Sequence, residues 1–566
     1  MEVLIVAKIN EILWKVETIT RGEALGDRSS YLVISNAYLY ACTNNLIYCK
    51  DGELLERANE INEHVSNDVI ERLNLLFVEL SLDGIRNLVY ELLSGKNYSP
   101  KSFIENSNNY ISELANDLLE IDDSGHIVMD FGSGTGNFLA NVYKKAHDNK
   151  FVLKDLCGIE INVEQAQISK MALSILSDGS VNPIIIIGNA LEKINYPYTK
   201  AYVFPPLGMK KLLSAEARNS FLFNDIYLSN RNSGEWLFID NMLSGLSGDR
   251  AVALVAGRAL FSNTDIEYRN RLIDSGWIEG IIELPSGSLS FTGIKVYMIV
   301  FSKGNERIKF VDASGVLEVE NKRYVNLELP VKKIEEMYYS DTVATKDAKE
   351  LIGIPNLCPS TILLDVKKLD NGVELKELAD IFIGNQYTLG VFENKGLLSN
   401  KSTGYRILTS SDIENGIVRW ESLRFVNMKD DKFDKFAVHF GDVVVTSKSS
   451  KVKTVVVDVE PEEKILVTGG MLIIRPNQTK LNPTYLKMFL DSEMGQLALK
   501  SIQKGNTIVT ISVSGLSTLE IPLISLEKQI EKAERYNAKL STLAAYKQEI
   551  ERIENSLKNI FEEEED

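Results

Sequence analysis

The chain has 566 residues, of which 44% are hydrophobic and 25% are charged. A domain usually takes about 100–200 residues, so this length predicts three or four domains with full cores and excludes a disordered or disulfide-stapled chain. The formal net charge of −17 excludes nucleic-acid binding over the whole surface, but residues 371–529 carry no net charge, so a local DNA-binding surface remains compatible.

The four cysteines and four histidines are scattered along the chain, so we expect neither a metal site nor a disulfide. The apolar N-terminus contains acidic residues and no small-residue cleavage site, which argues against a signal peptide. The chain has no run of about 18 apolar residues, so we expect no membrane span. These features predict a soluble, cytoplasmic protein with reduced cysteines.

Five regions follow one another along the chain. Residues 1–97 show helical periodicity and predict a helical N-terminal domain. In residues 98–315, uniformly apolar β-runs alternate with amphipathic helices, which predicts an α/β domain with a mostly parallel, doubly covered sheet. The charged residues 316–370 predict a connector or hinge. Residues 371–525 predict a separate β-rich domain, because short apolar runs alternate there with Gly and Asn turns.

Residues 526–566 predict one long helix with an acidic tail. Apolar residues recur every three or four positions, which makes a continuous seam. The seam either packs on its own domain or forms a coiled coil with a second copy or a partner, and we favour the coiled coil. The seam residues are Leu526, Ile530, Ala533, Tyr536, Leu540, Leu543, Tyr546, Ile550, Ile553, Leu557 and Ile560.

A glycine-rich loop lies between a predicted strand and a predicted helix. Its spacing is G-x-G-x-G, with Asp130 two residues before the first glycine, which differs from the dinucleotide-binding pattern and suits a ligand with a positive group. An acid at the end of the next strand can accept both ribose hydroxyls. The third strand ends in an asparagine, in position to meet an adenine edge. The predicted cofactor residues are Asp130, Gly132, Gly134, Gly136, Glu160 and Asn189.

Residues 90–315 resemble the N6-adenine DNA methyltransferases, in particular the modification subunit of type I restriction–modification systems. Tyr98-Ser99-Pro100 is similar to the "YTP" element, whose resemblance implies that Ser99 and Pro100 contact S-adenosylmethionine. DFGSGTGNFL, beginning at Asp130, resembles the "DPxxGTGxFL" loop. The resemblance implies a class I methyltransferase (Rossmann-like) core, S-adenosylmethionine as cofactor, and methyl transfer to a target adenine that has left the duplex stack.

The C-terminal part resembles one half of a type I specificity subunit, with a target recognition domain followed by a long helix. LKELADIFIGN resembles the start of that unit, and Ile521-Pro522-Leu523 with Gln529 resembles its end. This resemblance implies double-stranded DNA as a partner. It also implies a partner that binds through the long helix. This partner is either a second copy of the chain, giving a homodimer, or a methyltransferase, specificity or restriction subunit. The system implied is a prokaryotic restriction–modification or phage-defence system.

The family's catalytic Asn-Pro-Pro-Phe motif reads Phe204-Pro205-Pro206-Leu207 in this chain. In the family, a side-chain carbonyl and a backbone carbonyl accept the two N–H groups of the target amine, and an aromatic ring stacks on the base. Phe204 cannot accept a hydrogen bond, and Leu207 offers no flat ring. We therefore expect impaired or absent methyl transfer, with Asn189 or Tyr202 as the nearby polar residues that could substitute. The alternatives are an active site-specific methyltransferase and a DNA-binding regulator without cofactor.

Basic residues on turn-rich segments are candidates for contacts with phosphates and bases. Two of them follow the degenerate motif, and the others lie in the β-rich domain. Acidic residues are interspersed among the latter, so the alternative is that these basic residues are ordinary solvated surface charges. The predicted DNA-binding residues are Lys210, Lys211, Arg406, Arg419, Lys448, Lys451 and Lys453.

Overall fold

The computed structural model describes residues 2–559, except 21–28, 50, 64, 95–108, 178–180, 182, 208–217, 290–291, 317–328, 365–368, 370, 415, 429–430, 449–451 and 506–508. The chain forms two compact units, Met1–Leu363 and Leu364–Asp566. None of the described helices is long and apolar enough to cross a membrane.

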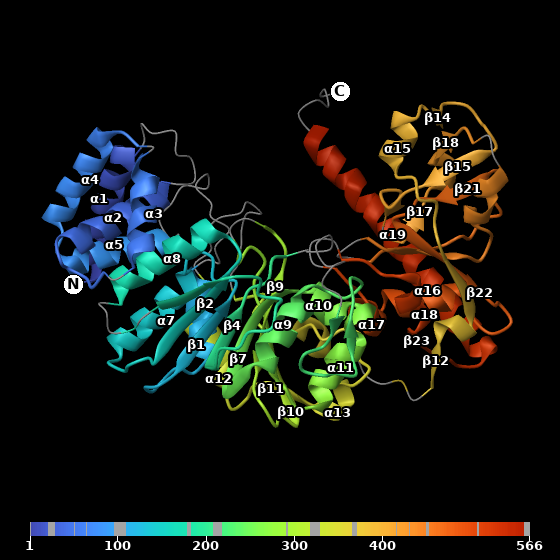
Figure 1. Ribbon diagram of the computed structural model, residues 1–566. Helices are drawn as coiled ribbons and strands as arrows, with labels where there is room; N and C mark the ends of the chain where they lie inside the picture. Colours follow the sequence, from blue (N-terminus) through green and yellow to red (C-terminus); the bar gives the residue numbers. More distant parts are fainter. Residues whose placement is uncertain are drawn as a thin grey trace. The chain divides into compact units, whose positions relative to one another are not determined.

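The first unit begins with helices whose apolar faces pack into one core (Figure 1). This core continues into the helices that cover one face of the central sheet, so the helical segment is an integral part of the unit. The helices are α1 (Glu2–Thr20), α2 (Ser29–Thr43), α3 (Gly52–Glu63), α4 (Asn67–Glu79) and α5 (Leu82–Ser94).

The central sheet of the first unit is mixed, with a parallel core that begins at one edge. The five strands from β3 to β7 run parallel, whereas β9 is antiparallel to both of its neighbours and β11 is antiparallel to β10. The described strands lie in the order β11 (Ala344–Asp347), β10 (Arg307–Asp312), β8 (Ile278–Glu283), β9 (Val296–Phe301), β7 (Leu246–Ala256), β4 (Tyr198–Val203), β1 (Ile127–Phe131), β2 (Asp155–Glu160) and β3 (Pro183–Ile187).

Helices cover both faces of this sheet, as its apolar strands predict (Figure 1). Alternate residues of β1 point to opposite cores: Val128 lies in the core with α5, α6 (Asn109–Leu118), α7 (Asn137–Asp148) and α8 (Val163–Leu176), and Met129 lies in the core with α9 (Glu235–Ser244) and α11 (Ile266–Asp274). The predicted α/β class is confirmed.

The structure differs from the predicted hinge at 316–370. Residues 331–362 contribute α12 (Val331–Tyr339), β11, α13 (Ala348–Leu351) and α14 (Pro359–Ile362) to the first unit. The reason is that β11 pairs with β10 as the outermost strand of the central sheet and that Ile334 and Tyr338 of α12 are fully buried. Charge on the exposed faces of these short elements concealed their apolar contacts.

The second unit contains two four-stranded sheets among its described residues. One has the order β13 (Ala379–Ile383), β22 (Met471–Pro476), β19 (Val443–Thr446), β20 (Thr454–Val456). The other has the order β14 (Leu398–Ser399), β18 (Arg424–Val426), β15 (Tyr405–Leu408), β21 (Lys464–Val467). Helix α16 (Pro483–Asp491) packs its buried residues Leu486 and Leu490 against the first sheet.

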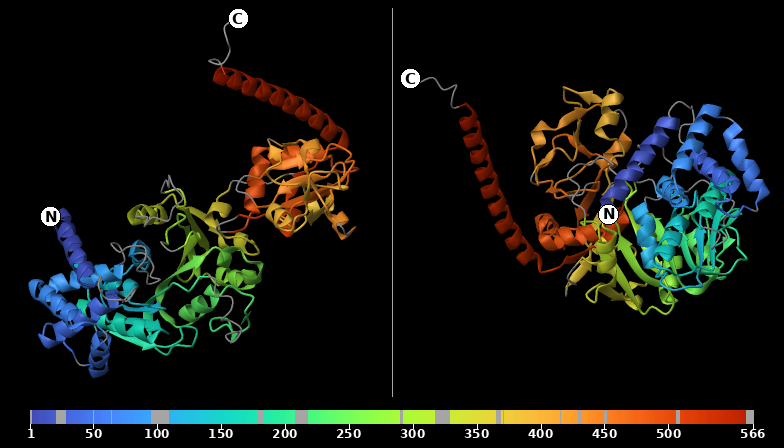
Figure 2. Two further views of the ribbon diagram at one scale, coloured as in Figure 1. Left: turned by 90° about the horizontal axis from the view of Figure 1, so that it is seen from above. Right: turned by 90° about the vertical axis from the view of Figure 1, so that its left-hand side faces the viewer.

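The long C-terminal helix α19 (Leu526–Asn559) is anchored at its first three turns. The fully buried amide of Gln529 accepts from the backbone of Asn482 at 2.9 Å and donates to the carbonyl of Lys480 at 3.0 Å. About two turns later, the Tyr536 hydroxyl donates to Asp491 at 2.7 Å. Beyond this point the helix extends away from α16 (Figure 2), and its residues Leu543 and Lys547 line a cleft together with Arg419 of the same unit.

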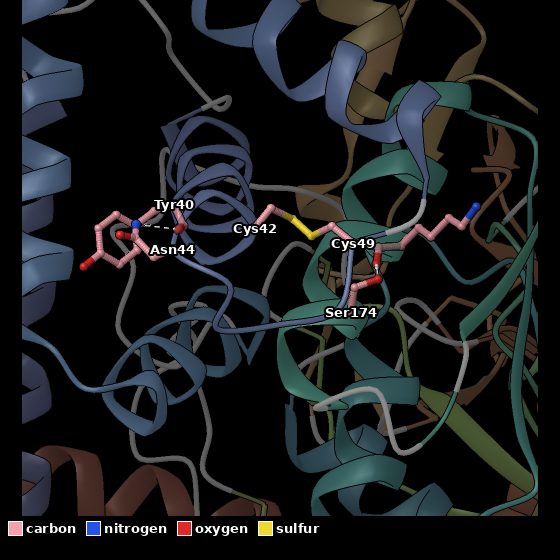
Figure 3. Close-up of a disulfide and its surroundings, with 6 residues drawn as sticks. Tyr40, Cys42, Asn44, Cys49 and Ser174 are labelled. Atoms are coloured by element: carbon pink, nitrogen blue, oxygen red, sulfur yellow. Dashed lines mark hydrogen bonds between the residues drawn. A yellow bond between two sulfur atoms is a disulfide. The ribbon is translucent and has the colours of Figure 1, made fainter.

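Cys42 and Cys49 form a disulfide in the helical segment (Figure 3). The expectation of reduced cysteines without a disulfide is wrong for this pair. Helix α2 ends at Thr43, and the following turn, closed by a hydrogen bond from Leu46 N to Ala41 O, brings the two Cα atoms to 5.6 Å. Cys157 and Cys358 are free and buried.

Candidate cofactor and target-base site

The candidate site lies at the carboxyl end of the parallel strands, where loops from adjacent strands meet. Phe131 of β1 pairs with Val203 of β4, so the glycine loop and the degenerate motif leave the sheet at the same level. Phe131 also pairs with Ile159 of β2, which places Glu160 beside the start of the glycine loop. The sheet therefore brings together Phe131 and Val203, which are 72 positions apart in the sequence.

The loop from Gly132 to Gly136 has a conformation that requires glycine at three positions. Gly132, Gly134 and Gly136 have φ values of 100°, 53° and 91°. A Cβ on Gly136 would lie 2.6 Å from the hydroxyl of Ser169, so α8 closes one side of the loop. A Cβ on Gly132 would meet no atom of the described residues within 4 Å, so among these residues the glycine leaves space for a ligand to approach.

Glu160 is tied to the loop by its side chain. One carboxylate oxygen accepts from Gly134 N at 2.8 Å, and the other accepts from Asn162 N at 2.8 Å. The residue is 8% exposed. Each carboxylate oxygen keeps a second lone pair, so the two oxygens can still accept from a pair of neighbouring hydroxyls.

Asp130 lies next to this carboxylate in a fully buried position. Burial and, second, the negative charge of Glu160 raise the pKa of Asp130 well above its ordinary value of 3.8. A cationic group bound at the loop would offset this repulsion. The paired acids, the open Gly132 and the lone pairs of Glu160 fit S-adenosylmethionine, which carries a sulfonium, an amino group and a ribose.

Two apolar side chains beside Glu160 are unusually exposed. Ile161 is 70% exposed and Ile187, at the end of β3, is 53% exposed. Glu160 pairs with Ile187 across the sheet, so both isoleucines flank the same carboxylate. Such a pair can pack against a flat adenine ring. The sequence analysis missed these residues, although an isoleucine directly after a strand-ending acid was a usable signal.

Asn189 follows β3, as predicted, but its side-chain oxygen accepts from Leu191 N at 3.0 Å within its own turn. Ser99, Pro100, Lys210 and Lys211 lie outside the described residues.

The degenerate motif begins directly after β4. Phe204 and Leu207 are partly buried and pack against the core that contains Phe138 and Tyr202. Pro205 is buried and Pro206 is exposed. Phe204 and Leu207 are therefore both involved in apolar packing.

Asp240, which the sequence analysis missed, is fully buried on α9 and fixes the chain that follows the motif. Its carboxylate accepts from the Arg218 guanidinium at 2.6 Å, from Phe221 N at 2.8 Å and from the Tyr268 hydroxyl at 3.0 Å. The hydroxyl of Ser220 also donates to it. A lone aspartate within an apolar helix was the signal in the sequence.

The predicted DNA-binding residues of the second unit fall into two groups. Arg406 pairs with Glu463 at 2.6 Å and donates to Glu421 O, and the Lys453 ammonium donates to the carbonyls of Ser410 and Ile413 at 2.9 Å, so these two cations stabilise the unit itself. Arg419 and Lys448 are exposed. Lys451 lies outside the described residues.

The profile of the N-6 DNA methylase family matches residues 92–377, about half of the chain. Among solved structures, the chain is similar to a type I restriction–modification methyltransferase subunit from Streptococcus thermophilus, with 15% identity, 61% of this chain and 96% of that chain covered, and a TM-score of 0.48. It is also similar to the type IIG restriction endonuclease BpuSI, with 14% identity, 89% and 72% covered, and a TM-score of 0.44. The HsdS subunit from Thermoanaerobacter tengcongensis shares 16% identity over 35% of this chain and 44% of that chain, with a TM-score of 0.25.

Proposed function

Because this chain belongs to the N-6 DNA methylase family and uses S-adenosylmethionine, we propose that it is a sequence-specific DNA-binding protein of a restriction–modification or related phage-defence system, with impaired methyl transfer. The single observation that carries this proposal is the sequence Phe204-Pro205-Pro206-Leu207 at the carboxyl end of β4, beside an intact glycine loop. Under this proposal the protein still binds the cofactor and recognises DNA, but its Phe204–Leu207 segment binds the target adenine weakly.

The chemistry explains the impairment. S-adenosylmethionine supplies an activated methyl group, and the protein must supply acceptors for the target amine. The carbonyl of Pro205 offers one acceptor, but the ring of Phe204 offers none. Loss of one well-placed acceptor costs about 2–4 kcal/mol of transition-state stabilisation, or two to three decades in rate. Loss of the ring at Leu207 costs about 1–3 kcal/mol in base stacking.

Neither polar residue considered as a substitute is well placed to act as an acceptor. Tyr202 is 2% exposed, and its ring stacks on Phe138 with centroids 4.3 Å apart, inside the core. The Asn189 carbonyl oxygen accepts a backbone hydrogen bond in its own turn. Both observations support impaired rather than relocated catalysis.

We propose that the second unit reads duplex DNA. Arg419 and Lys448 are exposed cations, whereas the other two predicted cations of this unit that the structure describes, Arg406 and Lys453, are engaged internally. Exposed arginine and lysine side chains contact phosphates and, in the major groove, guanine edges.

We propose that α19 associates with a second copy of this chain. Beyond its anchored turns, apolar side chains at the a and d positions of a heptad repeat are 47–66% exposed in their own unit. They are Leu543, Tyr546, Ile550, Ile553 and Leu557. A parallel pair would place Glu549 against the Glu554 of the second helix, whereas an antiparallel pair places Lys547 against it. The charges therefore favour an antiparallel pair and a two-part DNA site.

The test combines cofactor-binding calorimetry with methylation sequencing of DNA from cells that carry only this gene. We expect cofactor binding, and no adenine methylation at any defined motif. Restoring Phe204→Asn together with Leu207→Phe should produce methylation at one motif. Methylation by the unsubstituted chain would instead show an active methyltransferase, and absence of cofactor binding would favour a DNA-binding regulator.

A further inference from the structure

The side chain of Asn137 connects the cofactor loop to two helices of the N-terminal segment. Asn137 is the first residue of α7, directly after Gly136, and is 4% exposed. Its amide nitrogen donates to the carbonyl of Leu93 in α5 at 2.6 Å. Its amide oxygen accepts from the hydroxyl of Ser112 in α6 at 2.6 Å. One amide group therefore joins α5, α6 and the start of α7.

A second buried asparagine repeats this arrangement one turn later. The amide nitrogen of Asn141 donates to the side-chain oxygen of Asn109 in α6 at 2.6 Å. Its amide oxygen accepts from the Tyr90 hydroxyl of α5 at 2.9 Å. The Asn116 amide donates to the backbone carbonyl of Asn141 at 3.3 Å. The same three helices are thus joined at two levels.

This amide network lies within an apolar core that includes Leu114 and Phe138. A buried amide that loses its partner costs about 1–3 kcal/mol, whereas apolar side chains of the same shape would carry no such penalty. Unlike apolar packing, hydrogen bonds between amides have direction, so they allow one relative placement of the helices. The network therefore fixes where α7 begins.

The start of α7 is also the end of the cofactor loop. Gly136 takes a φ of 91°, its carbonyl accepts from Ala140 N at 2.9 Å, and Ser169 of α8 closes one of its sides. The hydrogen bonds of the Asn137 amide to Leu93 in α5 and Ser112 in α6 position the end of the loop relative to these two helices. Moving α7 would move the Gly134 N–H, which holds the Glu160 carboxylate at 2.8 Å.

We propose that Asn137 is a positioning residue through which α5 and α6 hold the glycine loop in the shape that binds the cofactor. Asn137 does this by its donor–acceptor polarity: the nitrogen must face Leu93 O, and the oxygen must face Ser112. The proposal rests on the cofactor site described above and adds that the helical segment is part of what makes this site competent.

The test is the nearly isosteric substitution Asn137→Asp, with S-adenosylhomocysteine as an unreactive probe and calorimetry as the measurement. Near pH 8 the introduced carboxylate would face the Leu93 carbonyl with two acceptors and no proton, so we expect Kd to rise at least tenfold. As the pH falls towards 5.5, the protonated carboxyl regains a donor. The ratio of the variant's Kd to that of the unsubstituted chain should then fall towards one.

The ratio is the informative quantity, because other groups titrate as well. Tyr90, Glu113 and Lys145 are titratable side chains that hydrogen-bond to members of the network, and Asp130 and Glu160 lie at the site. Their contributions are common to both proteins and cancel in the ratio. A merely structural defect would lower the melting temperature and leave the ratio independent of pH.

The matched control is Asn149→Asp, the same substitution at the other end of α7. Asn149 is exposed and donates its amide to Lys145 O at 2.8 Å, so we expect an unchanged Kd. If the Asn137→Asp variant does not fold, Ser112→Ala removes one partner of Asn137 and leaves the amide in place, and we expect a threefold or greater rise in Kd.

The outcomes separate the two proposals. A folded Asn137→Asp variant with unchanged Kd, a pH-independent ratio, or an unchanged Kd for Ser112→Ala would overturn the role of Asn137 alone. Absence of S-adenosylhomocysteine binding by the unsubstituted chain would overturn the cofactor site and, with it, this proposal.

Discussion

Asp130 and Glu160 lie at the carboxyl ends of adjacent parallel strands, and the charge of Glu160 adds to burial in raising the pKa of Asp130. In the chain without ligand this pair is unfavourable, because a buried carboxylate is penalised when it ionises near a like charge. Two acids are thus kept together at a cost in stability, which is expected where a cationic ligand is bound.

We expect Asp130→Asn to stabilise the ligand-free protein while weakening cofactor binding. The folded-state pKa of Asp130 is above its unfolded value of 3.8, so the stability that this carboxyl contributes is fully present below about pH 3.8 and is lost as the pH rises. At neutral pH the variant should therefore be more stable by about 1 kcal/mol or more. Thermal unfolding from pH 4 to 8 measures the difference, which should grow with pH.

The control for this substitution is Asp240→Asn, because Asp240 is equally buried but is paired with Arg218 and hydrogen-bonded by Tyr268. Breaking a buried ion pair costs about 3 kcal/mol, so this variant should unfold at a lower temperature. Equal destabilisation by both substitutions would contradict the view that Asp130 lacks a charge partner in the ligand-free protein.

A second prediction concerns the cations of the second unit. Arg419→Ala and Lys448→Ala should each weaken DNA binding, with little change in melting temperature. Each should also reduce, by about one, the magnitude of the slope of the logarithm of the binding constant against the logarithm of the salt concentration. Arg406→Ala should lower the melting temperature instead, because it removes the partner of Glu463. Fluorescence anisotropy at several salt concentrations, together with thermal unfolding, checks both statements. If only the Arg406 variant lost DNA affinity, Arg406 would be the DNA contact, and the assignment of Arg419 and Lys448 to DNA binding would be wrong.

These cations show the limit of sequence reasoning. The apolar runs at Ile127–Phe131 and Val296–Phe301 were recognisable as strands, because buried strands are continuously apolar. The direction of these strands could not be recognised from the sequence, because buried parallel and buried antiparallel strands have the same apolar pattern. β9 is antiparallel to its neighbours, although a mostly parallel sheet was predicted. Likewise, Arg406 finds its partner 57 residues away at Glu463, and no local pattern indicates that contact.

The same distinction holds at the cofactor site. The glycine spacing and the strand-ending Glu160 predicted the loop from local signals alone. The contact between Asn137 and Leu93 is made by residues 44 positions apart on different helices, and only the fold brings them together.

A third prediction concerns the disulfide between Cys42 and Cys49. In the loop-entropy description, closing a loop of this length stabilises the folded state by about 2 kcal/mol. Cys42→Ser, or reduction with dithiothreitol, should therefore lower the melting temperature of the first unit by several degrees. Cys358→Ser is a control for thiol loss, because Cys358 is a free thiol. Mass spectrometry under non-reducing conditions would show whether the pair is oxidised, and two free thiols at these positions would contradict the prediction.

The last prediction concerns self-association through α19. Ile550 is 55% exposed at a central a position of the proposed pair, so Ile550→Asp places two carboxylates in one interface. Burial of one isoleucine contributes about 1.5–3 kcal/mol, and the two-fold pair loses it twice, so the dissociation constant should rise by at least about two orders of magnitude. Sedimentation equilibrium measures this change.

The control is Ser541→Asp, because Ser541 is exposed and lies outside the a and d positions. This variant should have the same mass in solution as the unsubstituted chain. If the unsubstituted chain is monomeric at concentrations of about 100 μM, which corresponds to a binding free energy weaker than about 5.5 kcal/mol, the exposed stripe must be covered by a different partner.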